Sequence, residues 1–306
     1  MNWPDNKKFA FTVFDDADND FLTNTRPVYD LLSDLGFRTT KSVWTLAPRF
    51  ETELTGLSTE DAAYLEWIQS LVAKGFEVGW HGARCHGSPR DETIKALDLF
   101  RERIGHDPVS MSNHFQNEES IYWGQERLSG FAKLVYLLAN FRGRPKSSGH
   151  REGSVFFWGD HCVQRVKYIR NFVFREIDTL SVCPFMPYHD QRFPMANAWY
   201  ASSEGGDVGD FNELLKEENQ DRLAERGGGC IVYTHFGKGF FENGKLDGRF
   251  TALMTRLAAL GGWYVPVGRL LDYLAEQNGG VHPIGWEERK NLQWRWLSSK
   301  LRHGSS

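Results

Sequence analysis

The segment Phe11-Thr12-Val13-Phe14-Asp15-Asp16 places two adjacent carboxylates directly after a short apolar stretch that is typical of a buried β-strand. Adjacent residues at a strand end point in different directions, so one carboxylate can bind a metal ion while the other faces a substrate. A second interpretation is that the pair caps the following helix, with Asp18 and Asp20 serving only as solubilising charges. On the first interpretation, Asp15 and Asp16 are candidate site residues.

Similar β-rich stretches recur along the chain, and helical patterns separate most of them. The predicted strands span residues 9–14, 40–44, 76–80, 109–113, 155–158 and 230–234. The predicted helices span residues 26–35, 59–74, 91–103, 211–225, 250–260 and 267–276. Gly36, Gly75 and Gly261 follow predicted helix ends, where left-handed C-terminal caps favour glycine. Strands that alternate with helices form parallel sheets, and so many elements in one chain favour an α/β barrel over an open sheet.

We expect one barrel over residues 1–280. The stretch 142–206 breaks the alternation and is rich in Gly, Ser and Pro, so we expect it to be an insertion of long loops over one barrel face. Residues 281–306 differ in character and predict a C-terminal amphipathic helix.

This C-terminal segment presents an apolar stripe and a surplus of basic residues. The stripe consists of Trp286, Trp294, Leu297 and Leu301. One interpretation is a helix packed on the barrel or on a second subunit in a homo-oligomer. The other is peripheral contact with an anionic membrane surface at the inner face of the membrane.

Composition narrows the possible classes of protein. Hydrophobic residues make up 41% of the 306 residues and charged residues 25%, and the mean hydropathy is -0.49, a profile of soluble globular proteins. The net charge of -4 provides no global basic field, so we expect no nucleic-acid partner. We see neither a signal-peptide pattern nor a long apolar run, and expect a cytoplasmic protein. The four scattered cysteines indicate neither a disulfide framework nor a thiolate zinc site.

Histidines also end predicted strands. His81 follows the strand 76–80, and His114 and His235 follow the strands 109–113 and 230–234. Because the carboxyl ends of parallel barrel strands open on one face, these imidazoles should converge with the two aspartates. Imidazole and carboxylate ligands together suit one divalent metal ion, with zinc the expected ion.

These segments resemble the polysaccharide deacetylases, the carbohydrate esterases with NodB homology, of which the chain looks like a divergent member. Residues 12–16 are similar to the first motif of that family, residues 77–82 to its second, and residues 233–236 to its last. Residues 263–274 look like the end of the barrel, so the resemblance extends from about Phe9 to Leu274. It implies a distorted (β/α)7-type barrel.

The resemblance also implies chemistry, namely metal-dependent removal of acetyl from an N-acetylated amino sugar. By the same analogy, Asp15 is the general base, Asp16 and His81 are metal ligands, and His235 is the general acid. The division of roles is physically reasonable, because an amine leaves readily only when it is protonated.

The second motif departs from the family pattern. The family places its two histidines four residues apart, whereas His81 and His86 are five apart. We favour His114 as the third metal ligand, since the end of a strand holds it rigidly, and retain His86 as the competitor.

Three residues are candidates for contacts with the substrate or the base. Arg170 replaces the arginine of the family's third motif and either fixes Asp15 or is an ordinary surface charge. Lys41 either meets a phosphate or carboxylate of the substrate or is solvated. Trp199 resembles the family's acetyl-pocket tryptophan, with core packing as its alternative role.

The leading expectation is a cytoplasmic N-deacetylase in surface-polysaccharide biosynthesis, such as that of O-antigen or capsule. Its substrate would be an N-acetylated sugar linked to a nucleotide or a lipid. Two alternatives remain open: a same-fold amidase acting on a small non-sugar amide, and a non-catalytic sugar-binding protein.

Overall fold

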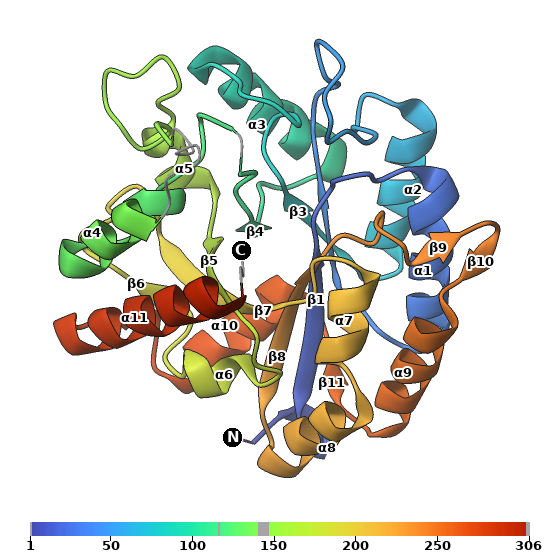
Figure 1. The fold of residues 1–306 in the computed structure, drawn as a ribbon. Coiled ribbons are helices and arrows are strands. Elements are labelled where there is room, and N and C mark those ends of the chain that lie inside the picture. The colour runs from blue at the N-terminus through green and yellow to red at the C-terminus, as the bar shows by residue number, and fades with distance from the viewer. Residues whose placement is uncertain (1, 116, 140–146, 304–306) are drawn as a thin grey trace.

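Seven parallel strands close into a barrel in the computed structural model, which describes residues 2–115, 117–139 and 147–303 (Figure 1). In spatial order they are β1 (Ala10–Asp15), β2 (Thr40–Val43), β3 (Glu77–Trp80), β4 (Ser110–Met111), β5 (Tyr168–Phe174), β7 (Ala198–Glu204) and β8 (Gly229–Thr234). The barrel closes where β8 pairs with the whole of β1, from Ala10 opposite Gly229 to Asp15 opposite Thr234. The predicted distorted (β/α)7-type barrel is confirmed.

Helices surround the barrel, and one apolar core joins them to the strands. They are α1 (Leu22–Asp34), α2 (Ala62–Ala73), α3 (Arg90–Ile104), α4 (Gly130–Ala139), α5 (Gly159–Arg165), α6 (Thr179–Val182), α7 (Val208–Leu214), α8 (Glu217–Arg226), α9 (Gly248–Ala259), α10 (Val267–Gln277) and α11 (Trp286–His303). Gly36, Gly75 and Gly261 have φ angles of 84°, 89° and 75°, which confirms the predicted left-handed positions at helix ends. None of the helices in the described residues is long and apolar enough to span a membrane.

Shorter elements complete the chain. They are the 3₁₀-helices η1 (Pro4–Asn6) and η2 (Gly124–Arg127) and the strands β6 (Tyr188–His189), β9 (Phe241–Glu242), β10 (Lys245–Leu246), β11 (Trp263–Tyr264) and β12 (His282–Pro283). Strand β11 pairs with the start of β1, as Ala10 opposite Trp263 shows, at the end of the barrel away from Asp15.

The stretch 142–206 contains more than the expected loops, although residues 142–146 lie outside the described part of the chain. Two barrel strands, β5 and β7, fall within it. Both carry polar residues that are buried inside the barrel, so their sequences lack a continuous apolar run. The strand predicted at 155–158 was wrong, since these residues form turns before α5 and the Val155 side chain is exposed.

Helix α11 packs on this barrel beside α4 and β5 (Figure 1). Leu292, Trp296 and Leu297 are buried there, and the Trp296 ring lies 5.3 Å from that of Phe172. Only part of the predicted stripe forms this face, because Trp286 and Leu301 are exposed. The structure therefore agrees with the interpretation of a helix on its own barrel, while the membrane and oligomer interpretations stay predictions.

A fully buried ion cluster fixes the end of β1. The Lys41 ammonium on β2 lies 3.0 Å from Asp15 Oδ2 and 2.9 Å from Asp20 Oδ2. Asp15 Oδ1 accepts a hydrogen bond of 2.7 Å from the Phe236 amide, which follows β8. Burial raises the pKa of Asp15 to about 6, although the nearby Lys41 opposes this increase. The cluster thus joins β1 to both of its barrel neighbours.

We expect Lys41→Met to lower the free energy of unfolding by roughly 3–5 kcal/mol, because it leaves two buried carboxylates without their cation. The matched control is Lys167→Met, since Lys167 forms an exposed ion pair with Asp272 and should contribute at most about 1 kcal/mol. Urea unfolding followed by circular dichroism measures both. Similar losses in the two variants would contradict a structural role for the Lys41 cluster.

Candidate active site

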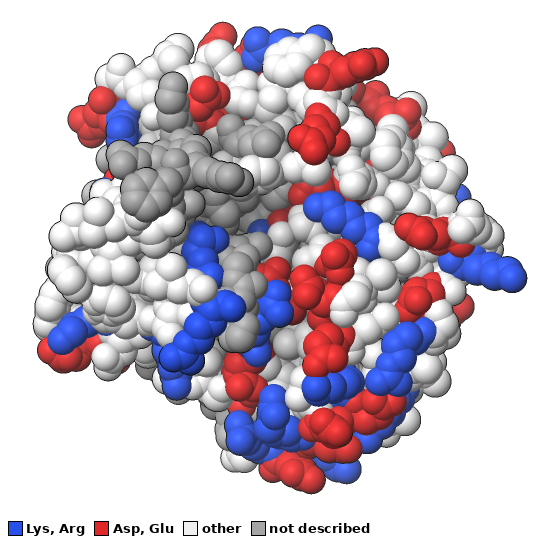
Figure 2. All heavy atoms as spheres, in the orientation of Figure 1, with Lys and Arg blue, Asp and Glu red and all other residues white. Residues whose placement is uncertain are grey.

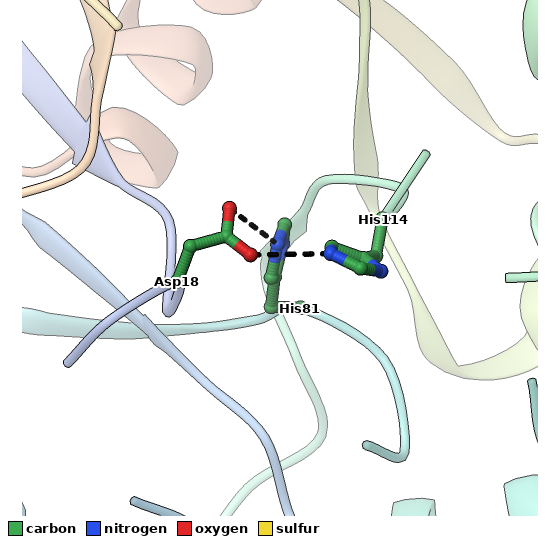
Figure 3. A group of neighbouring side chains, drawn as sticks. All are labelled: Asp18, His81 and His114. Atoms are coloured by element: carbon green, nitrogen blue, oxygen red, sulfur yellow. Dashed lines mark hydrogen bonds and ion pairs between the residues drawn. The ribbon is translucent and has the colours of Figure 1, made fainter. Parts of the chain in front are cut away.

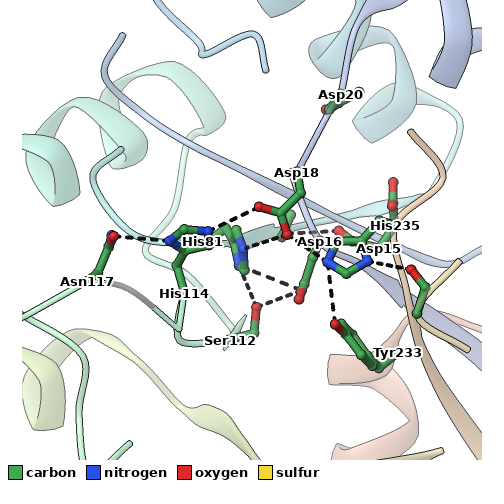
Figure 4. A network of polar contacts seen from close by, with 12 residues as sticks. Asp15, Asp16, Asp18, Asp20, His81, Ser112, His114, Asn117, Tyr233 and His235 are labelled. Atoms are coloured by element: carbon green, nitrogen blue, oxygen red, sulfur yellow. Dashed lines mark hydrogen bonds and ion pairs between the residues drawn. The ribbon is translucent and has the colours of Figure 1, made fainter. Parts of the chain in front are cut away.

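A cavity of about 440 Å³ lies where the barrel strands end. Its acidic and imidazole lining residues are Asp16, Asp18, His81, His114 and His235. Figure 2 shows this face of the molecule hollowed near its centre. Figure 4 shows these side chains in one polar network, with Asp18 between His81 and His114 on one side and His235 on the other.

His81 follows β3 and has a defined proton arrangement. The Ser112 hydroxyl donates to Asp16 Oδ1 at 2.7 Å, so its oxygen accepts the Nδ1–H of His81, also at 2.7 Å (Figure 4). The His81 Nε2 therefore carries a lone pair. This atom is buried without a hydrogen-bond partner among the described residues and lies 4.0 Å from Asp18 Oδ2.

His114 follows β4 and is oriented in the same way. Its Nδ1 lies 3.1 Å from Asn117 Oδ1, and the Asn117 amide nitrogen donates in turn to Glu119 Oε1 and to the Arg84 carbonyl. The amide oxygen thus faces the imidazole and receives its Nδ1–H. The His114 Nε2 is left to face Asp18 Oδ1 at 3.1 Å.

Asp18, His81 and His114 form a candidate metal centre (Figure 3), because one ligand atom from each lies within 4.8 Å of the others. Two imidazole lone pairs directed at a carboxylate repel one another unless a cation lies between them. Burial lowers the pKa of His81 to about 4, so that ring carries no extra proton at neutral pH. Two donors on one tetrahedral zinc ion are separated by about 3.3 Å, close to the observed spacings. The residues therefore fit a divalent ion.

Asp16 faces the cavity as an ionised carboxylate. Arg170 on β5 holds it with two bonds, 3.0 Å to Oδ1 and 2.6 Å to Oδ2. Burial alone would raise the pKa of Asp16, but Arg170 and then His81 outweigh it and lower the pKa to about 2. Asp16 is thus a fixed proton acceptor beside the metal donors.

His235 follows β8 on the other side of Asp18. Its Nδ1 donates to the Gly206 carbonyl at 2.6 Å, and its Nε2 lies 2.6 Å from Asp18 Oδ2 and 3.4 Å from the Tyr233 hydroxyl (Figure 4). The Nε2 atom is therefore the one directed at the metal centre, and a proton on it can pass to a bound group.

The structure brings together five of the residues that the sequence nominated: Asp16, His81, His114, Arg170 and His235. Arg170 binds Asp16 and not Asp15, for which the sequence proposed it.

Four nominated residues lie outside the lining of the cavity formed by the described residues. Asp15 and Lys41 pair with each other beneath it. Trp199 is buried in the core, where it packs against Phe193. His86 stacks on Phe50 at 4.2 Å between ring centroids, and its Nε2 accepts the Arg49 amide hydrogen.

Asp18 was missed as a site residue, having been considered only as a solubilising charge. The signal was the spacing Asp16-x-Asp18, because residues two apart in an extended segment point to the same side. Ser112, which connects His81 to Asp16, carried no sequence signal of its own.

Comparisons with known proteins bear on the fold. Neither family models nor curated proteins match the sequence. A solved structure described as a putative polysaccharide deacetylase from Mycobacterium smegmatis aligns with a TM-score of 0.50 and 12% identity, over 93% of this chain and 96% of that one. PuuE allantoinase aligns with a TM-score of 0.51 and 13% identity, over 93% and 94%. The chain shares their fold. The resemblance that the motifs suggested is confirmed at this level.

We expect about one divalent metal ion per chain in the purified protein and its loss in Asp18→Asn and His81→Ala, each of which removes one ligand. His86→Ala is the matched control and should retain the ion. Elemental analysis measures the content, with circular dichroism to verify folding. Retention of the ion in folded Asp18→Asn would exclude this centre, and its loss in His86→Ala would restore His86 as a ligand.

Proposed function

We propose that this protein is a metal-dependent amide hydrolase that removes acetyl from an N-acetylated amino sugar. The observation that carries the proposal is the convergence of three metal donors, Asp18, His81 and His114, with an ionised carboxylate and an imidazole. The shared fold with a structure described as a putative deacetylase supports the same reaction class. A purely sugar-binding protein, the non-catalytic alternative, would need neither Asp16 nor His235 in these positions.

A divalent ion, zinc in our proposal, would polarise the acyl carbonyl and make water more acidic when held by the three donors. Asp16 accepts the proton of the attacking water, and Arg170 keeps that carboxylate ionised and oriented. His235 donates a proton from Nε2 to the leaving nitrogen, since an amine is a poor leaving group unless it is protonated. The hydrogen bond from His235 Nδ1 to the Gly206 carbonyl fixes the ring for this transfer.

This proposal assigns the base role to Asp16, although the resemblance implied Asp15. Both Asp15 oxygens are occupied inside the protein, one by the Phe236 amide and the other by Lys41. The Asp16 carboxylate lines the cavity, and Arg170 gives it the support that the resemblance assigns to an arginine. The reassignment thus moves the base one residue along the chain and the metal-binding carboxylate to Asp18.

For the substrate, we propose an N-acetylated sugar linked to a nucleotide or a lipid, a precursor of a surface polysaccharide such as O-antigen or capsule. The reaction would take place in the cytoplasm or at the inner face of the membrane. The alternative, a small non-sugar amide, has support from the fold shared with PuuE allantoinase. A screen of N-acetylated sugars for acetate release, with allantoin as a competing substrate, discriminates between the two classes.

We expect Asp16→Asn and His235→Ala to lower kcat by about 10²–10⁴-fold, because each removes one proton-transfer group. The metal content should stay near one per chain, since neither side chain belongs to the three donors. Acetate release under saturating substrate measures kcat. A folded, metal-loaded Asp16→Asn protein with undiminished kcat would remove Asp16 from the mechanism.

Arg170→Met should change the pH dependence of activity. In the parent protein, Asp16 with a pKa of about 2 stays ionised at every practical pH. Without the guanidinium, burial raises that pKa, so Asp16 becomes protonated and activity falls at a higher pH than before. The acidic limb of kcat/KM in Arg170→Met should therefore shift upward, and Arg170→Lys should restore part of the original profile. Superimposable acidic limbs would show that Arg170 does not set the charge of Asp16.

A further inference from the structure

A second group of charged side chains lines the cavity, apart from the metal donors. Arg127 comes from η2 and Lys300 from α11, and both lie against the indole of Trp296. Figure 2 shows Lys and Arg side chains over the C-terminal part of α11, at the lower edge of the hollow. The mechanism proposed above uses neither Arg127 nor Lys300.

Arg127 is a buried cation, only 3% exposed. Its guanidinium lies between two indoles, 4.1 Å from the Trp123 centroid and 4.4 Å from that of Trp296. Nη1 donates to the Asn171 carbonyl at 2.8 Å, but Nε has no hydrogen-bond partner in the described part of the chain. No described carboxylate forms an ion pair with Arg127, although a buried charge normally has an opposite one beside it.

Lys300 adds a second positive charge on the same indole, with its Nζ 5.5 Å from the Trp296 centroid. Burial, and then the nearby Arg127, lower the pKa of Lys300 to about 8, while Glu204 acts in the opposite direction. The Lys300 ammonium is therefore mostly protonated at neutral pH. Two like charges on one ring disfavour each other, and an anion placed beside them would stabilise both.

The whole cavity has a surplus of positive charge. Two carboxylates, Asp16 and Asp18, line it together with four cationic side chains. The cations are Arg127, Arg170, Lys238 and Lys300. Asp16 is already neutralised by Arg170, and Asp18 belongs to the metal centre, where a divalent ion would add further positive charge. Neither carboxylate is thus available to balance Arg127 and Lys300.

We propose that Arg127 and Lys300 form an oxyanion subsite, which binds a phosphate or carboxylate group of the substrate while its amide lies at the metal centre. The identity of that amide rests on the proposed function, but the binding of the oxyanion does not. Helix α11 then contributes to substrate selection through Lys300, and a neutral N-acetylated sugar leaves the subsite empty.

The test uses full-length protein freed of metal with a chelator, so that an added anion cannot bind to the ion. Isothermal titration calorimetry with inorganic phosphate, and separately with glucuronate, compares the parent with Lys300→Gln, Arg127→Gln and the control Lys290→Gln. Lys290 lies on the same helix but is exposed, so its substitution changes the net charge equally. Lys300→Gln provides the result if Arg127→Gln, which empties a site between two indoles, does not fold.

We expect at least one of the two anions to bind the parent and the Lys290→Gln control alike. Lys300→Gln and folded Arg127→Gln should bind it about tenfold more weakly, as the loss of a charged hydrogen bond predicts. The stronger of the two anions identifies the oxyanion as phosphate or carboxylate. Absence of binding to the parent, or equal binding by Lys300→Gln and Lys290→Gln, would overturn the subsite. Anion binding that depends on Lys300, in a metal-loaded protein that hydrolyses no N-acetylated compound, would uphold the subsite and refute the proposed function.

Discussion

The cost of burying charge organises the carboxyl ends of the barrel strands. Four aspartates lie within six residues at the end of β1, and all are buried. Each buried carboxylate needs a cation or several hydrogen bonds to stay ionised, and each finds them on a different element. Asp15 draws in Lys41 from β2, Asp16 draws in Arg170 from β5, and Asp18 meets imidazoles that follow β3, β4 and β8. The charges of one segment thus fix the relative positions of most of the barrel.

Adjacent carboxylates in this segment have separate tasks because of their surroundings. Asp15 points below the cavity floor, where Lys41 and a backbone amide enclose it. Asp16 points into the cavity, where Arg170 keeps it charged but leaves it beside the metal donors. Two residues of identical chemistry therefore serve structure and reaction, and only the direction of each side chain decides which.

The sequence was sufficient to predict the barrel, since β1, β2, β3 and β8 are apolar and alternate with capped helices. It was also sufficient to nominate His81, His114 and His235, because histidines that end parallel strands meet on one face. It was insufficient for β5 and β7, whose buried Arg170 and Ser202 are typical of loops until a closed barrel supplies their partners. The distinct surroundings of Asp15, Asp16 and Asp18 likewise depend on barrel closure, because residues after β8 enclose Asp15 and reach Asp18.

The Ser112 hydroxyl links two parts of the site that are usually considered separately. It accepts from His81 Nδ1 and donates to Asp16 Oδ1, so a metal ligand and the proton acceptor share one hydrogen-bond chain. Any cation that withdraws electron density from His81 makes its Nδ1–H a stronger donor, and the polarised hydroxyl then holds Asp16 more tightly. Basicity at Asp16 therefore follows the identity of the ion, and exchanging one metal for another would retune both ends of the reaction at once.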